Sequence, residues 1–252
     1  MHKFLIIVYF LLNALFQNGT SFADDKVLCQ DNVNNASLIG GWYLWEPYQY
    51  NQIATGGYEL TGMDVKLAQQ IAANIGIAIK YTPVSWEQHQ IDLKDGLRDI
   101  ASGATYTEER SKYAYFSVPY RYEENSLFML QDSDKDLSFE NITEFLAQLR
   151  LQNFTLGVTR GFIYADQQIN IFVSDESNHD IIIKFNNDAE SLAALIRGDI
   201  DGFISDRVVG ASAVLNSKNV NVNIKEISLG IKTPIHFMFS KKNVSVNTVD
   251  RF

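Results

Sequence analysis

The sequence predicts an α/β protein built from two similar lobes. Three observations lead to this prediction: strands alternate with amphipathic helices, the same local plan occurs twice, and glycine and aspartate stand at matching places in both copies. The chain has 252 residues, enough for one or two domains. It is 46% hydrophobic and 20% charged, which is typical of a globular protein and excludes a disordered chain.

The first α/β segment begins with a helix near residue 61. Thr61 is placed to cap this helix, and Asp64 falls in its first turn. Apolar residues then recur at the 3.6-residue period as far as Gly76, a natural helix stop. Residues 77–81 alternate like a strand. Residues 85–88 form a capping box for a second helix that ends near Gly96, and another strand begins at Asp99.

A second segment repeats this plan. Residues 156–158 predict a short strand, residues 189–197 a helix that ends at Gly198, and residues 201–204 a strand. Residues 93–99 and 195–201 both read Leu-x-x-Gly-x-x-Asp. In open α/β sheets ligands bind beyond the carboxyl ends of the strands. Residues 102–110 and 205–207 occupy those places, so we expect a ligand cleft between the two lobes.

The first 23 residues have the features of a secretory signal peptide. Lys3 precedes an apolar run of thirteen residues from Phe4 to Phe16, and small residues at Ser21 and Ala23 suit a signal peptidase. The run is shorter than the roughly 20 residues of a transmembrane helix, although an uncleaved anchor is an alternative. Cys29 follows bulky Leu28, which argues against lipidation, and a single cysteine excludes an internal disulfide.

Charge and composition disfavour several functions. The 30 acidic against 21 basic residues give a net charge of -9, which disfavours nucleic-acid binding and adhesion to anionic lipid. The four histidines are scattered without metal-ligand spacing. Neither a phosphate-binding loop nor a nucleophile–base pair is evident, so we expect a binding protein without a metal or cofactor, and not an enzyme.

Several short motifs follow one another in a specific order and spacing. They are Pro47-Tyr48, residues 60–68 (LTGMDVKLA), residues 83–86 (PVSW), residues 103–110 (GATYTEER), residues 116–120 (FSVPY) and residues 201–206 (DGFISD). With them the chain resembles family 3 of the periplasmic solute-binding proteins, the polar amino-acid-binding components of ABC importers, over residues 38–240. The resemblance implies a type II periplasmic-binding fold, a monomer located in the periplasm, an amino-acid ligand and a membrane permease as partner. It divides the chain into a signal peptide (1–23), a first lobe (24–120), a second lobe (121–229) and a return to the first lobe (230–252).

The resemblance also implies the ligand-binding residues. The Arg of the family's Thr-x-x-Arg motif holds the ligand carboxylate, because a guanidinium matches a carboxylate with two parallel hydrogen bonds. Asp206 of the second lobe accepts the ammonium, although it could instead pair with Arg207 or cap a helix. Thr107 caps the helix that follows it. The full expected set is Trp45, Trp86, Ser102, Gly103, Thr105, Arg110, Thr159 and Asp206.

The chain departs from the family pattern at three places. Trp42 stands where relatives often carry a polar residue that contacts the ligand. Bulky residues 162–164 (FIY) replace a small-residue run, and we expect them to narrow the site. Residues 246–252 can begin the family's final helix but cannot complete it, so we expect reduced stability or a partner over the first lobe.

Two other functions stay open on this fold. One is a receptor module that senses a solute and signals through a separate membrane partner. The other is a dehydratase acting on carboxylic acids that are precursors of aromatic compounds, with Glu46 and Asp206 as the candidate cleft acids.

Overall fold

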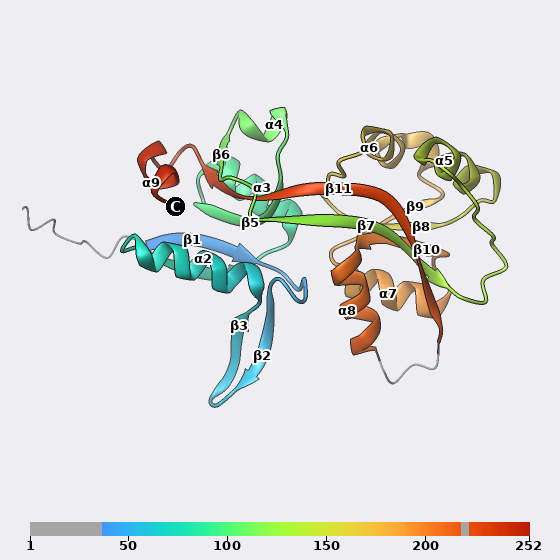
Figure 1. Ribbon diagram of the computed structural model, residues 1–252, viewed down its shortest axis with the longest axis horizontal. Coiled ribbons are helices and arrows are strands. Elements are labelled where there is room, and N and C mark those ends of the chain that lie inside the picture. The colour runs from blue at the N-terminus through green and yellow to red at the C-terminus, as the bar shows by residue number, and fades with distance from the viewer. Residues whose placement is uncertain (1–36, 218–221) are drawn as a thin grey trace, which may run out of the picture. The chain divides into compact units, whose positions relative to one another are not determined.

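The computed structural model describes residues 37–217 and 222–252. The predicted signal peptide and Cys29 lie outside the described residues. In the described part the main sheet has the strand order β4-β1-β5-β11-β7-β10-β8-β9, and β6 pairs with β11 (Figure 1). A separate hairpin consists of β2 and β3. The mixed α/β class predicted from the sequence is confirmed.

The first half of the chain supplies the parallel strands β1, β4 and β5 with their helices. Its elements are β1 (Ser37–Trp42), β2 (Tyr50–Ala54), β3 (Gly57–Thr61), α2 (Met63–Asn74), β4 (Ala78–Pro83), α3 (Trp86–Asp95), β5 (Ile100–Thr105), α4 (Glu108–Ser111) and β6 (Ala114–Phe116).

The second half supplies the parallel strands β8, β9 and β10. Its elements are β7 (Arg121–Leu130), α5 (Ile142–Leu151), β8 (Leu156–Thr159), α6 (Gln167–Ser174), η1 (Glu176–Asn178), β9 (Ile182–Phe185), α7 (Asp188–Arg197), β10 (Gly202–Asp206), α8 (Arg207–Asn216), β11 (Ile224–Ser240) and α9 (Val246–Arg251).

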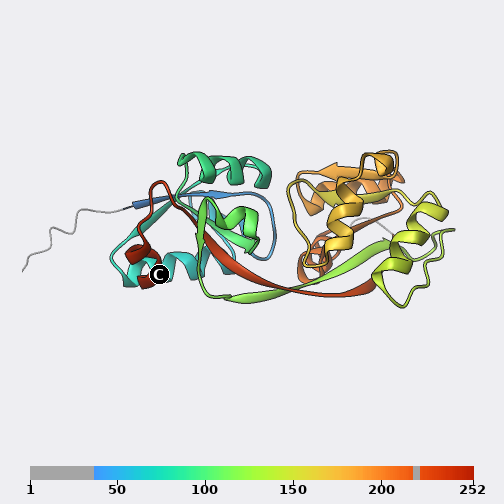
Figure 2. The same cartoon turned by 90° about the horizontal axis from the view of Figure 1, so that it is seen from above.

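Two long antiparallel strands, β7 and β11, join the two sets of parallel strands. They run side by side in both views (Figures 1 and 2), and β11 pairs with β5 at one end while β7 pairs with β10 at the other. Their register shifts between Ser228 and Ile231, where Gly230 has φ +67°. The lobe boundaries at residues 120/121 and 229/230 stay predictions.

The repeated Leu-x-x-Gly-x-x-Asp motif has one structural role in both copies. Gly96 and Gly198 end α3 and α7 in the left-handed conformation, with φ near +77° and +76°. Asp99 then accepts a hydrogen bond from Ile39 N (2.7 Å), and Asp201 accepts one from Thr155 N (2.7 Å). Each aspartate therefore ties its own strand to the start of the neighbouring one.

The predicted helix starts are right at two places and wrong at one. Ser85 caps α3 by accepting from Gln88 N, and Thr107 caps α4 by accepting from Arg110 N. Thr61 does not cap α2: the N-cap residue is Gly62, and no side chain caps that position. Thr61 is the last residue of β3 and is buried, so its hydroxyl cannot serve the helix end.

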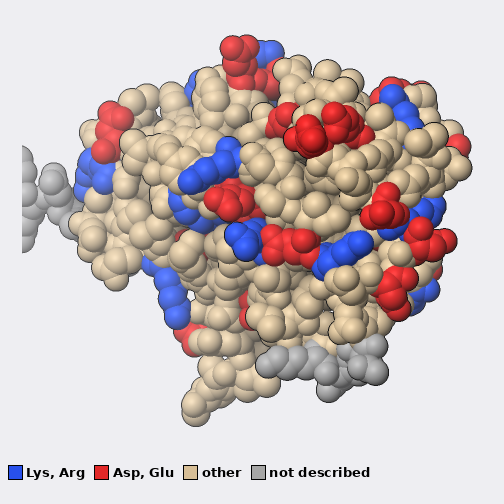
Figure 3. Space-filling view, turned by 45° about the vertical axis from the view of Figure 1, so that its right-hand side comes forward, with Lys and Arg blue, Asp and Glu red and all other residues tan. Residues whose placement is uncertain are grey.

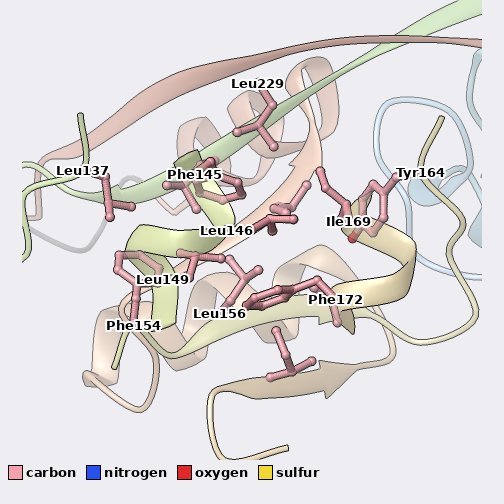
Figure 4. Packing of buried hydrophobic residues seen from close by; sticks show 14 of the residues in the cluster. Leu137, Phe145, Leu146, Leu149, Phe154, Leu156, Tyr164, Ile169, Phe172 and Leu229 are labelled. Atoms are coloured by element: carbon pink, nitrogen blue, oxygen red, sulfur yellow. The ribbon is translucent and has the colours of Figure 1, made fainter. Parts of the chain in front are cut away.

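Each half has its own hydrophobic core. The largest cluster of the second half packs α5 and α6 against β8, with Phe145, Leu149 and Leu156 fully buried at its centre (Figure 4). Around the parallel strands β1 and β5, Leu38 and Ile100 form a cluster beneath α2 with Phe239 of β11, and Phe252 packs its ring on those of Phe237 and Phe239.

Two surface properties bear on the class of protein. Acidic and basic side chains lie interspersed on the face drawn in Figure 3, without a continuous basic surface. Among the helices of residues 37–217 and 222–252, none has the length and apolar character needed to span a bilayer.

Candidate functional site

A small polar cavity collects five of the eight residues expected to bind ligand. Its volume is about 20 Å³, which is room for about one water molecule. Its wall includes the expected Trp45, Trp86, Gly103, Thr105 and Arg110. The wall also includes Glu123, Asn125, Phe162, Ile163, Tyr164 and Thr233, which the sequence did not assign to the ligand.

Arg110 is held in the cavity wall by groups on both sides. It lies in the short helix α4 and is only 3% exposed. Its Nε and Nη2 both donate to Gln90 Oε1, at 3.0 and 2.6 Å. Its Nη1 donates to Thr105 O (2.9 Å), and Nη2 also donates to Gly161 O (3.2 Å). Burial lowers the pKa of Arg110 to about 10, so the guanidinium stays charged at neutral pH. The edge that could hold a carboxylate is thus occupied by an amide oxygen.

Trp45 and Gly103 form one wall by very close approach. Gly103 has φ +78°, and a Cβ added to it would lie 2.3 Å from the Trp45 ring. Only glycine fits here, because a side chain would both clash and strain the backbone. The Gly103 amide donates to the Tyr120 hydroxyl (3.0 Å). Trp45 is 1% exposed and meets the Phe162 ring edge-on, with ring centroids 5.8 Å apart.

Trp86 connects the two halves of the site. It is the first residue of α3, and its Nε1 donates to Gly161 O at 3.1 Å. The Arg110 guanidinium carbon lies 5.4 Å from the centroid of its ring. Trp86 therefore packs beside the Arg110 guanidinium and holds the Gly161 carbonyl.

The segment 161–164 forms part of the cavity wall, and the narrowing expected from its bulky side chains stays a prediction. Gly161 has φ +77°, and its carbonyl accepts from Trp86, Gln90 and Arg110. Phe162, Ile163 and Tyr164 then line the wall opposite β5. The remaining space of about 20 Å³ is much smaller than an amino acid.

A buried ion cluster lies on strand β7 beside the cavity. Arg121 pairs with Asp64 (3.0 Å) and with Glu123 (2.7 Å), and its guanidinium stacks on Tyr48 at 3.6 Å from the ring centroid. Burial raises the pKa of Glu123 to about 8, even though Arg121 opposes this. Glu123 therefore carries a proton much of the time at neutral pH. Arg121 and Glu123 lie two positions apart on β7 and therefore on the same face of the strand, which is the sequence signal for this cluster.

Three expected residues lie outside the cavity wall described above. Asp206 accepts hydrogen bonds from the Tyr48 hydroxyl (2.9 Å), Glu124 N (3.1 Å) and Val209 N (3.4 Å). It caps α8, the alternative role considered from sequence, and lines a separate surface hollow of about 720 Å³. Arg207 pairs with Glu226 instead of Asp206.

Ser102 and Thr159 are buried next to the site and are not in its wall. Ser102 is 5% exposed on β5, and Thr159 is 4% exposed at the end of β8. The Thr159 carbonyl accepts from Phe162 N (3.1 Å), so this residue supports the turn into the 161–164 segment. Trp42, half-buried at the end of β1, also lies outside the wall.

Three residues of the cavity wall carry buried polar atoms that have no hydrogen-bond partner in the described part of the chain, which indicates that the cavity can hold a polar ligand or a water molecule. Trp45 Nε1, Tyr164 Oη and Thr233 Oγ1 are buried and have no hydrogen-bond partner among the described residues. Buried polar groups are nearly always paired, so a guest or a water must satisfy them. Within the same part of the chain, three or more His, Cys, Asp or Glu side chains nowhere gather as metal ligands would.

The fold and this cleft define a two-lobed protein of the solute-binding class. Residues 39–243 match the model of the bacterial extracellular solute-binding proteins, family 3, and the chain belongs to that family.

The relatives of this chain include proteins named as an enzyme and proteins named as amino-acid binders. Cyclohexadienyl dehydratase from Pseudomonas aeruginosa is 39% identical over 97 residues, 38% of this chain and 34% of the relative, so the chain spans about a third of that enzyme. A probable histidine-binding protein from Campylobacter jejuni is 27% identical over 72% of each chain. An ancestral arginine-binding protein bound to arginine superposes with a TM-score of 0.70, covering 86% of this chain and 88% of that one, at 23% identity.

Proposed function

We propose that the protein is an extracytoplasmic solute-binding protein that captures an amino acid or a similar polar solute between its lobes and delivers it to an ABC permease. The observation that carries the proposal is the buried, charged Arg110 beside a cavity with unsatisfied polar atoms. The names of the histidine-binding and arginine-binding relatives support an amino-acid ligand.

The ligand carboxylate would take the place of the Gln90 amide oxygen on Arg110. That oxygen accepts from both Nε and Nη2, the edge of the guanidinium that can donate two parallel hydrogen bonds to the two oxygens of a carboxylate. The exchange requires opening, because Trp86, Gln90 and Arg110 all bond to Gly161 O. A ligand that contacts both sides would then favour reclosure, since both sets of contacts exist only in the closed form.

Asp206 remains the proposed acceptor of the ligand ammonium, with Glu123 as a second acid nearby. The negative charge of Asp206 contributes to the raised pKa of Glu123, so the two carboxyl groups lie within electrostatic reach. A ligand ammonium near both would favour the ionised form of Glu123.

The remaining parts of the proposal concern export and organisation. We propose that residues 1–23 direct the chain to the periplasm, that the lobes comprise residues 24–120 with 230–252 and residues 121–229, and that the protein acts as a monomer.

The test is a thermal-shift screen of the purified protein against the twenty amino acids, because a ligand that binds only the folded state raises the melting temperature. Arg110→Ala should weaken binding of the responding amino acid by about 3–6 kcal/mol, the value of two charged hydrogen bonds at about 1.5–3 kcal/mol each. Arg197→Ala is the control, since the side chain of this arginine is 61% exposed, pairs with Asp199 and does not line the cavity. Unchanged affinity in Arg110→Ala would refute the carboxylate assignment.

A dehydratase is the second candidate, and Glu123 is the observation that favours it. A carboxyl group that is protonated at neutral pH and faces a cavity beside an arginine can donate a proton to a leaving hydroxyl group. The resemblance to cyclohexadienyl dehydratase supports this candidate. Release of an aromatic product from a cyclohexadienyl carboxylic acid, lost in Glu123→Gln, would establish the enzyme. Inertness together with amino-acid binding would establish the binding protein.

A further inference from the structure

A second cavity of about 300 Å³ lies apart from Arg110, against helices α7 and α8. Its wall is mostly apolar: Leu44 contributes from the segment after β1, Leu192 and Ile196 from α7, and Val209 and Ala213 from α8. The two helices lie side by side at the lower edge of the sheet in Figure 1. This volume is at the lower end of the range for small-molecule pockets, and an apolar lining is typical of them.

One carboxylate stands in this apolar wall without a partner. Asp188 lines the cavity and is 3% exposed, and neither of its oxygens has a hydrogen-bond partner among residues 37–217 and 222–252. The Ser205 hydroxyl is close enough to lower the pKa of Asp188, but it donates its hydrogen bond to the Asp206 backbone oxygen (3.1 Å). A buried carboxylate is normally paired or fully hydrogen-bonded, because burying it otherwise is costly.

An acid at this position could cap the helix, but another residue caps α7. Asp188 is the first residue of α7, where a helix dipole favours a negative charge. The cap of α7, however, is Asn187, whose side chain accepts from Glu190 N (3.0 Å). Asp188 is therefore not needed to satisfy the helix end, and its position in the cavity wall calls for another explanation.

A second buried carboxylate lies within electrostatic reach of Asp188. This is Asp206, which accepts hydrogen bonds from the Tyr48 hydroxyl, Glu124 N and Val209 N and forms no ion pair among residues 37–217 and 222–252. Burial raises the pKa of Asp188 to about 6, and the charge of Asp206 adds to this rise while the Ser205 hydroxyl opposes it. What this region lacks is a positive charge.

We propose that this cavity binds a small organic monocation, with its ammonium group on Asp188 and its apolar body between α7, α8 and Leu44. The neighbouring carboxylates of Asp188 and Asp206 favour a positively charged ligand. The apolar wall favours a ligand with a hydrocarbon body over a strongly hydrated inorganic ion. The proposal does not depend on which solute binds beside Arg110, because the two cavities share only Trp45 among their lining residues.

Titration calorimetry of the purified protein with hexylammonium chloride tests the proposal, with 1-hexanol and hexanoate as probes of equal chain length. Hexylammonium should bind at least tenfold more tightly than either. Asp188→Asn should weaken its binding at least tenfold, and Ala193→Leu, which fills the cavity, should weaken it similarly. Glu190→Gln, a change on the same helix outside the cavity wall, should leave it unchanged.

Each variant is first checked for cooperative unfolding, so that a folding defect is not counted as lost binding. The proposal is overturned if wild-type protein does not bind hexylammonium, if hexanol binds as tightly, or if folded Asp188→Asn and folded Ala193→Leu both bind like wild type.

Discussion

Gln90 Oε1 accepts hydrogen bonds from both Nε and Nη2 of Arg110, at 3.0 and 2.6 Å. The two residues are 20 positions apart, on α3 and α4. The Gln90 amide nitrogen also donates to Gly161 O at 3.1 Å. In the binding mode proposed above, the ligand carboxylate would replace this amide oxygen, so Gln90 would stabilise the closed arrangement and compete with the ligand.

The first prediction concerns this competition. Gln90→Ala should tighten amino-acid binding roughly tenfold, about 1.4 kcal/mol, because the ligand no longer displaces an internal acceptor. Calorimetric titration with the responding amino acid measures the change. Gln88→Ala, an exposed glutamine on the same helix, is the matched control. Weaker binding in Gln90→Ala would mean that Gln90 positions Arg110 and does not compete.

The second prediction tests the contact between Gly103 and Trp45. Gly103→Ala should destabilise the protein by about 1–3 kcal/mol more than Gly198→Ala, because overpacking adds to backbone strain. Both glycines have nearly the same positive φ, but a Cβ at Gly198 meets nothing within 4 Å. Urea unfolding of both variants measures the difference. Equal losses would show that the Trp45 ring moves aside at little cost.

The third prediction is a pH effect of Asp188. Burial raises its pKa from the ordinary value of 3.8 to about 6 in the folded protein, so the folded state holds this proton more tightly. The stability this contributes is fully present below pH 3.8 and is lost as the pH rises through about 6, a loss of about 3 kcal/mol. Asp188→Asn should therefore be more stable than wild type at pH 7.5, and its stability should fall less between pH 4.5 and 7.5.

Urea unfolding at these two pH values makes the comparison. Asp180→Asn serves as the control because its side chain is 82% exposed. An identical pH slope in wild type and Asp188→Asn would contradict a buried, unpaired carboxylate.

The fourth prediction concerns His89, whose contribution to stability changes with pH in the opposite direction to that of Asp188. His89 is buried on α3 with its Nε2 3.0 Å from Ile100 O, and burial lowers its pKa to about 4 from 6.5. Stability from neutral His89 is present above pH 6.5 and is lost as the pH falls toward 4. At pH 5 the loss should reach about 2 kcal/mol.

His89→Gln should remove most of that loss between pH 7 and pH 5, as measured by urea unfolding. The exposed His179 gives the control variant His179→Gln. If both histidine variants show the wild-type pH dependence, His89 becomes protonated without disturbing the fold.

The sequence alone determined the α/β class, the repeated plan and most helix ends. Ser85, Thr107, Gly96 and Gly198 act through hydrogen bonds and backbone angles within a few residues, so their roles can be predicted from neighbours along the chain. Thr61 shows the limit of such prediction. Its place at the end of a buried strand, set by packing against distant residues, keeps its hydroxyl from the helix that it precedes.

The tertiary structure decided which of these residues meet. Trp45, Trp86, Gly103, Thr105 and Arg110 share a cavity because β1, α3, β5 and α4 converge, and motif order had already placed them near one another. Gln90 on Arg110, Glu123 beside Arg121 and the unpaired Asp188 depend on contacts between segments far apart in the chain. Local sequence patterns do not encode the distance or the burial of such pairs, and these two quantities set both the charge state and the free space of the site.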